Sequence, residues 1–279
     1  MTSTTTSPAT ASPTSGTSDV ARRRVPGPVP FGRLVGVEVR KTGDTRSSRW
    51  ILLALGLLAA GACAVVLGFM PSETWTYGTF LDQISYPLAL GIPMLAVLSV
   101  AGEWGQRSAL TTFTLVPRRG RVVAAKAAVA AGYVVVTMAL AFGLAALCTL
   151  VAGAAAGDDA ASVLWDVPVG QQLRLVLFMA VAMAVGFTLA VVLRHTAAAM
   201  VGYLLIALVL PNLSSLLASV QDWYRDAAPW VEITSAQYNL LGPDAPTGEQ
   251  WAQLGTTVLL WIVLPLTLGV RRLLRVEIR

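Results

Sequence analysis

A polar segment, EWGQRSALTTFTLVPRRGRVVAAK, separates two long apolar stretches in the first half of this chain and occupies residues 103–126. Glu103 and Arg107 are four residues apart, a spacing at which opposite charges pair on the surface of a helix. Pro117 disfavours helical backbone at the residue before it, so we expect the helix to end there. Arginines and a lysine follow. These residue types predict ion pairing and docking rather than the making or breaking of covalent bonds.

The apolar residues of this segment are spaced as on one face of a helix. Phe113 and Val116 are three residues apart, while Arg107 and Thr111 belong to the opposite face. We therefore expect a short amphipathic helix over residues 103–117, with its apolar face on the membrane and its polar face toward the cytosol. A loop that only sets the topology of the chain is the alternative. If the helix docks a soluble partner, the candidate docking residues are Glu103, Arg107, Phe113, Pro117, Arg118, Arg119 and Lys126.

Residue types that could perform catalysis or hold a cofactor are sparse elsewhere. Cys63 and Cys148 lie inside apolar runs, and His195, the single histidine, lies at the end of another. None of them has a neighbour at metal-ligand spacing. Neither of the two lysines follows a glycine-rich phosphate loop, and no hydrolase motif occurs. We expect no cofactor, no metal and no catalytic residue, and therefore no enzymatic activity in this chain.

The elements that must position the polar segment are membrane spans. The chain has 279 residues, of which 55% are apolar and only 13% charged, whereas about a quarter of the residues in a soluble domain are charged. Six runs without an ionisable side chain reach the roughly 20 residues that cross a bilayer as a helix. We therefore expect an all-α, polytopic integral membrane protein. Its six transmembrane helices are expected at about residues 50–70, 83–102, 122–153, 174–193, 196–220 and 251–270.

Basic residues are distributed unevenly between the two sides of such a bundle. If the amino terminus is cytoplasmic, 18 of the 20 Arg and Lys residues lie on that side, and only Arg174 and Arg225 lie on the other. This asymmetry predicts cytoplasmic N and C termini. Aromatic residues near residues 221–249 predict an interfacial segment on the opposite side. Prolines are expected to bend the second, fifth and sixth spans; they are Pro87, Pro93, Pro211 and Pro265.

The amino-terminal region has two parts. Residues 1–30 are rich in Ser, Thr and Pro and contain few large apolar side chains, so we expect a disordered cytoplasmic tail. Residues 31–49 combine apolar residues on one face with basic residues that can contact lipid phosphates, which predicts an amphipathic interfacial helix before the first span. A basic stretch that only sets the orientation is the alternative. A single membrane domain, residues 31–279, would then follow the tail.

This arrangement resembles the type 2 permeases of ATP-binding-cassette (ABC) exporters over about residues 31–279. Six spans of this spacing carry the resemblance, together with the residues between the second and third spans, which are Glu103, Arg107, Pro117, Arg118, Arg119 and Lys126. The resemblance implies that residues 103–117 form a coupling helix against a separate ATP-binding subunit. It implies that residues 221–249 form short re-entrant helices. It also implies that two permeases assemble, either two copies of this chain or this chain and a related one.

The expected function follows from the spans and the resemblance together. The spans contain no acid or base that could relay protons or sodium ions, so we expect energy to come from outside the chain. We expect the permease subunit of an exporter in the bacterial plasma membrane, moving a lipid-like or drug-like substrate, surrounded by membrane lipid and without a nucleic-acid partner. Two alternatives are a membrane assembly or anchoring protein without a transport role and a secondary-active exporter.

Overall fold

A computed structural model describes residues 30–105, 119–156 and 166–275, and within these ranges the regular structure is entirely helical. Six helical segments are long and apolar enough to cross a membrane, which confirms the predicted all-α class and that count for the described residues. Four are single helices: α2 (Arg46–Phe69), α3 (Tyr77–Gly105), α5 (Arg119–Ala156) and α7 (Val169–Leu193). The fifth joins α8 (Thr196–Leu204), η2 (Leu205–Val209) and α9 (Leu210–Val220). The sixth joins α12 (Gly248–Val258), η4 (Leu259–Val263) and α13 (Leu264–Arg275).

The remaining helices are short and lie between or before these segments. Helix α1 (Phe31–Asp44) precedes the first segment, as predicted for an interfacial helix, and η1 (Ser72–Thr74) connects α2 to α3. The stretch predicted at residues 221–249 folds into three further short helices before α12 begins. They are α10 (Asp222–Val231), α11 (Ile233–Tyr238) and η3 (Asn239–Leu241).

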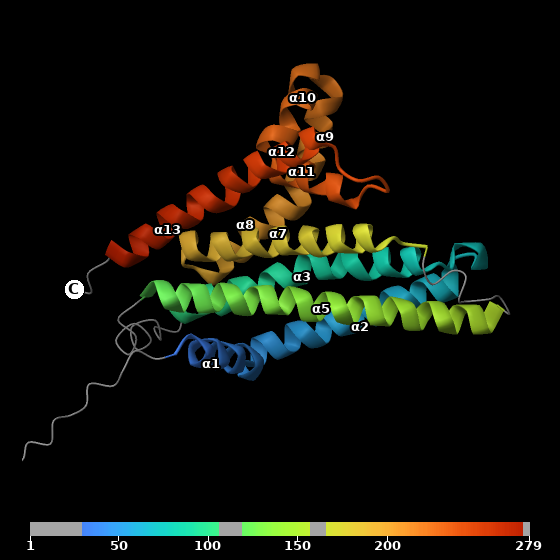
Figure 1. Cartoon of the computed structure of the whole chain (residues 1–279), viewed down its shortest axis with the longest axis horizontal. Coiled ribbons are helices and arrows are strands. Elements are labelled where there is room, and N and C mark those ends of the chain that lie inside the picture. The colour runs from blue at the N-terminus through green and yellow to red at the C-terminus, as the bar shows by residue number, and fades with distance from the viewer. Residues whose placement is uncertain (1–29, 106–118, 157–165, 276–279) are drawn as a thin grey trace, which may run out of the picture.

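Helices α3 and α7 form the centre of the molecule. Figure 1 shows α2, α3, α5 and α7 extending along the long axis, with α9 to α13 on one side of them. Helix α3 packs against α2, α5, α7 and α8. Within an apolar stretch of 18 residues in each segment, 61% of the stretch in α3 and 67% of that in α7 is buried. The corresponding shares are 22% for α2 and 11% for the fifth segment. The two central helices therefore supply the core, and the peripheral segments present apolar side chains to their surroundings.

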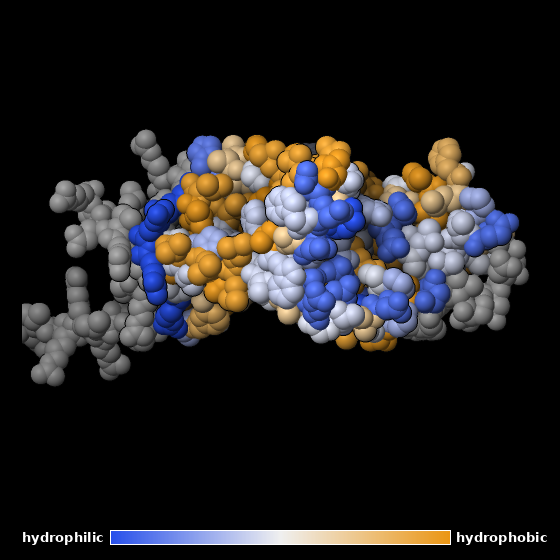
Figure 2. Space-filling model, turned by 90° about the horizontal axis from the view of Figure 1, so that it is seen from above, coloured by the Kyte–Doolittle hydropathy of each residue, from blue (hydrophilic) through white to orange (hydrophobic). Residues whose placement is uncertain are grey.

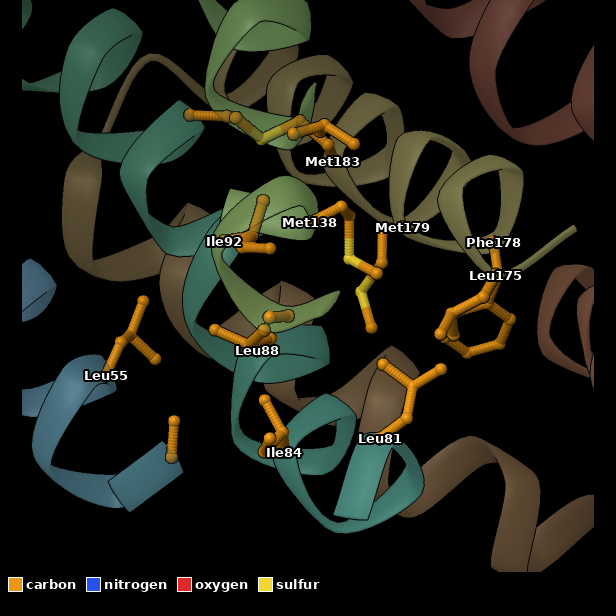
Figure 3. Close-up of a cluster of buried hydrophobic side chains, with 14 of the residues drawn as sticks. Leu55, Leu81, Ile84, Leu88, Ile92, Met138, Leu175, Phe178, Met179 and Met183 are labelled. Carbon is orange, nitrogen blue, oxygen red and sulfur yellow. The ribbon is translucent and has the colours of Figure 1, made fainter. Parts of the chain in front are cut away.

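Close helix contacts in this core depend on small residues, as is usual where lipid removes the hydrophobic drive for helices to associate. At Gly186 of α7, a β-carbon would lie 2.9 Å from the carbonyl oxygen of Pro93 in α3. At Gly91 of α3, it would meet the side chain of Leu55 in α2, which would have to move. At Gly186 the neighbour is backbone, so only glycine permits that approach. Around them, Figure 3 shows side chains from α2, α3, α5 and α7 filling one common cluster.

Prolines in the fifth and sixth segments each follow one π-helical turn. The amide of Leu210 donates to the carbonyl of Leu205, five residues back, immediately before Pro211. The sixth segment repeats this geometry in η4, immediately before Pro265. A proline ring clashes with the carbonyl of the preceding turn and removes one donor, and a wider π turn accommodates both effects. The helical chain therefore continues past each proline instead of ending there.

Several helices extend beyond the charge-free runs from which the spans were predicted. Helix α3 begins at Tyr77, so Asp82 lies inside it, and α12 begins at Gly248 rather than near residue 251. A charged side chain near a helix end does not interrupt the backbone hydrogen bonds, so the absence of charge underestimates helix length. The start of α12 is set by a capping box, in which Thr247 and Gln250 each bond the other's backbone amide.

The surface carries a hydrophobic band that suits a membrane. Figure 2 shows orange, hydrophobic residues between a blue edge close to the C-terminal end of α13 and a second blue area over the short helices α10 to α12. Large apolar side chains on the fifth segment are exposed, including Val201, Leu205, Leu213 and Leu216. Because exposed apolar surface of this extent is unusual in a soluble monomer, the band indicates contact with lipid or with another membrane helix.

Candidate functional site

The structure describes part of the predicted docking segment. Helix α3 ends at Gly105, so the backbone of Glu103 belongs to its last turn, and Arg119 is the first residue of α5. Lys126 lies about two turns further along α5. The other candidate docking residues lie outside the described residues; they are Arg107, Phe113, Pro117 and Arg118.

Lys126 forms a buried junction between three helices. Its Nζ atom donates to Oε2 of Glu38 in α1 at 2.6 Å and to the backbone carbonyl of Ser99 in α3 at 2.9 Å. Glu38 is 5% exposed and Lys126 is 6% exposed. Burial of one charge alone is costly, so the opposite charge and the additional acceptor are what allow Lys126 to lie inside an apolar helix. We call this three-residue contact the α1 junction.

Both lysines of the chain contact the same carboxylate. The Nζ atom of Lys41 lies 3.6 Å from Oε1 of Glu38, one turn away on α1, and its side chain remains 43% exposed. From the sequence, Lys41 belongs to the basic residues of 31–49 that were predicted to contact lipid phosphates, Lys126 was predicted to dock a partner, and no role was predicted for Glu38. A signal was present, because Lys126 is a single cation in an apolar stretch and such a group requires a partner. Glu38 is the only acid between residues 31 and 43.

The α1 junction includes one residue from each helix that flanks the connection between α3 and α5. Ser99 lies in the last two turns of α3, and Lys126 lies in the first turns of α5. Residues 106–118 connect these two helix ends, and α1 is tied to both of them through Glu38 and Lys126. The α1 junction therefore joins α1 to both helices that flank residues 106–118.

A first cavity, of about 260 Å³, lies away from the α1 junction, between α3, α7, the fifth segment and α11. Two hydrogen bonds position its walls. The Tyr203 hydroxyl donates to the carbonyl of Ala89 at 2.6 Å. In a regular helix this carbonyl accepts from the amide of residue 93, but Pro93 has no amide hydrogen. The Gln237 side chain donates to the carbonyl of Phe178, also at 2.6 Å. The lining includes Tyr86, Pro87, Phe178, Tyr203, Ile206 and Tyr238.

A second cavity, of about 290 Å³, adjoins the first between α3, α7 and η3. Tyr86, Ala89, Phe178 and Tyr238 line both cavities, so these side chains form the wall between them. Figure 3 shows Leu175, Phe178 and Met179 on α7 and Leu81 on α3, all of which line the second cavity. Together the two cavities reach the volume range of sites that take small molecules.

Polar groups are concentrated at the α11 side of these cavities. The Arg174 guanidinium donates to the carbonyls of Leu240, Gly242 and Pro243 at 2.9 to 3.2 Å and so holds the chain after α11 in place. Partial burial raises the pKa of the Tyr238 hydroxyl above its ordinary value, and Tyr86 and Glu232 add to the shift. The Tyr238 phenol is therefore neutral near pH 7 and can donate a hydrogen bond.

Candidate metal ligands and the single histidine are not gathered into a metal site in the part of the chain that the structure describes. That part contains no group of three His, Cys, Asp or Glu placed to hold a metal ion. His195 instead caps α8, where its Nδ1 atom accepts from the Ala198 amide at 3.2 Å. Comparison with known proteins adds no relative, because no protein-family model and no curated protein matches the chain.

Proposed function

We propose that this chain is the permease subunit of an ABC-type exporter, which moves a lipid-like or drug-like substrate out of a bacterial cell with energy from ATP hydrolysed by a separate subunit. The observation that carries the proposal is the α1 junction. It ties both ends of the connection at residues 106–118 to one buried ion pair. A soluble motor that pressed on this connection would move α1, α3 and α5 together.

The cavities support transport over simple anchoring. A membrane anchor needs only a packed bundle, whereas this bundle leaves two adjoining spaces of about 260 and 290 Å³ beside its central helices. The π turns in η2 and η4 support the same proposal, because such turns are frequent at functional sites and η2 contributes Ile206 and Ala207 to the first cavity. In this mechanism, displacement of α3 by the motor changes the shape of both cavities.

The proposed orientation places the α1 junction in the cytoplasmic half of the membrane. To test it, Cys63 and Cys148 are replaced by Ala, and a single cysteine is introduced as Phe113→Cys. The matched control is Asp244→Cys, in the exposed turn before α12. An impermeant maleimide should label intact cells at position 244 only, and permeabilised cells at both positions. Labelling of position 113 in intact cells would contradict the proposal.

The same Phe113→Cys chain tests the partner. A photoreactive crosslinker attached at position 113 in native membranes should capture a protein that contains a P-loop, and its ATP hydrolysis should be sensitive to vanadate. Replacing Glu103 and Arg107 together by Ala should abolish export, since these residues are proposed to transmit the push, while membrane insertion is retained. Normal export by the inserted double variant would show that this part of the proposal is wrong.

A secondary-active exporter is the second candidate, and one observation favours it. Asp82 lines the second cavity inside the second membrane-length segment, which is where a proton-coupled carrier needs an acid. The two candidates differ in their energy source. Vanadate should stop export by the ABC-type permease, and a protonophore at constant ATP should stop export by the secondary carrier.

A further inference from the structure

Aromatic rings dominate the wall that the two cavities share. Tyr86 comes from α3, Phe178 from α7 and Tyr238 from α11, and Tyr203 adds a fourth ring to the first cavity. The rings of Phe178 and Tyr238 lie 5.8 Å apart and are tilted by 45°. Aromatic faces attract organic cations as well as apolar groups, because the face of each ring carries partial negative charge. The walls alone therefore accept a neutral or a cationic apolar ligand.

The charges near the cavities distinguish between these two ligands. Among the residues that the structure describes, Asp82 is the only Asp, Glu, Lys, Arg or His side chain that lines either cavity. Within the described residues, its carboxylate has no ion pair and no hydrogen bond. A second acid lies near it, because the Asp166 carboxylate accepts from the amide of Gly78, one helical turn before Asp82, at 3.0 Å. The electrostatic field at this end of the second cavity therefore favours a cation.

Arg174 lies on α7 between Gln171 and Leu175, which line the second cavity, but its guanidinium already has acceptors. Arg174 donates hydrogen bonds to the carbonyls of Leu240, Gly242 and Pro243, and it lines neither cavity. In the first cavity the Thr234 hydroxyl is buried, lines the wall and has no partner within the described residues. The second cavity thus offers the Asp82 carboxylate, the residues shared by both cavities offer aromatic rings, and the first cavity offers the Thr234 hydroxyl.

We propose that the two cavities together bind an amphipathic organic monocation. Its charged group lies at Asp82, and its apolar body lies against Tyr86, Phe178 and Tyr238. As the substrate class of an exporter this inference rests on the proposed function, but binding itself needs no partner subunit and no ATP.

The test uses the full chain in lipid nanodiscs and two fluorescent probes. Ethidium serves as the amphipathic aromatic cation, and N-phenyl-1-naphthylamine serves as the neutral aromatic probe. Asp82→Asn removes the charge with little change in shape, and Asp222→Asn is the control, since Asp222 lies on α10, is exposed and pairs with Arg225. Asp82→Asn should weaken ethidium binding at least about tenfold, as expected for loss of a charged contact. It should change binding of the neutral probe by less than about twofold.

Two further variants keep the test decisive. Asp82→Glu should retain most of the ethidium affinity, and Tyr86→Ala should weaken binding of both probes. Equal ethidium binding by Asp82→Asn and the unmodified chain would overturn the proposal, and so would an unmodified chain that binds only the neutral probe or neither probe. If ethidium binds as expected but export is insensitive to vanadate, the proposed function fails alone. If export is sensitive to vanadate but Asp82→Asn has no effect on ethidium, this inference fails alone.

Discussion

The α1 junction allows a sharp prediction about stability, because both lysines of the chain contact one carboxylate in different environments. Lys126 is buried and lies 2.6 Å from Glu38, whereas the Lys41 side chain is 43% exposed and lies 3.6 Å from the same carboxylate. Replacing each lysine by Met makes the same chemical change and retains most of the side-chain volume. The two variants therefore compare a buried with a half-exposed ion pair to one partner.

The expected magnitudes differ severalfold. Lys126→Met leaves the Glu38 carboxylate buried without its closest partner, and breaking a buried pair in this way costs about 3–5 kcal/mol. It also removes the hydrogen bond to the carbonyl of Ser99. Lys41→Met removes a longer contact that water already screens, so the expected loss is about 0–1 kcal/mol. The measurement is the free energy of unfolding from titration with SDS in mixed micelles, followed by tryptophan fluorescence.

A double-variant cycle isolates the pair from the other contacts of each residue. Glu38→Gln with Lys126→Met removes both charges, so no unpaired charge remains buried. We expect this double variant to lose less stability than the sum of the single variants by at least about 1 kcal/mol. If Lys126→Met and Lys41→Met destabilise equally, or if the two single losses simply add, the buried pair does not hold the three helices together and the reasoning is refuted.

Two further predictions concern packing around Pro93. Gly186→Ala should lower the free energy of unfolding by about 1–3 kcal/mol, because the added methyl group would lie 2.9 Å from the Pro93 carbonyl. Gly132→Ala, with open space around it in α5, should be neutral or stabilising, and a similar loss at both positions would contradict this explanation. Tyr203→Phe should cost about 1–3 kcal/mol, because the carbonyl of Ala89 would lose its donor. Most of that cost should disappear when Pro93→Ala restores the backbone amide, and a cost unchanged by Pro93→Ala would show that the hydrogen bond is not responsible.

The helical fold was predictable from local features of the sequence. A long apolar run in a bilayer must satisfy its backbone hydrogen bonds internally, and a helix does so without contacts from distant residues. The amphipathic pattern after residue 30 likewise predicted α1 before any packing was known. Helix ends were less predictable, because the charge-free run begins only after Asp82, whereas α3 begins five residues before Asp82, at Tyr77.

The candidate site was predictable only in part. Lys126 was predicted to be a docking residue because it belongs to the motif that carries the resemblance, but its partner, Glu38, is 88 residues away along the chain. Which helix faces Lys126 depends on how α1, α3 and α5 pack, and the spacing of residues within any one helix does not contain that information. The roles proposed for Glu103, Arg107 and Phe113 remain predictions.

The sequence by itself determined that this protein is helical and that six segments can cross a membrane, because both properties follow from the cost of placing polar backbone and charged side chains in hydrocarbon. Tertiary structure alone decided that Lys126 is neutralised by Glu38, that Tyr203 replaces the donor removed by Pro93, and that Asp82 lines a cavity beside aromatic rings. Each of these contacts joins different helices. Their existence depends on the distances between helices, which only the packing of the whole bundle establishes.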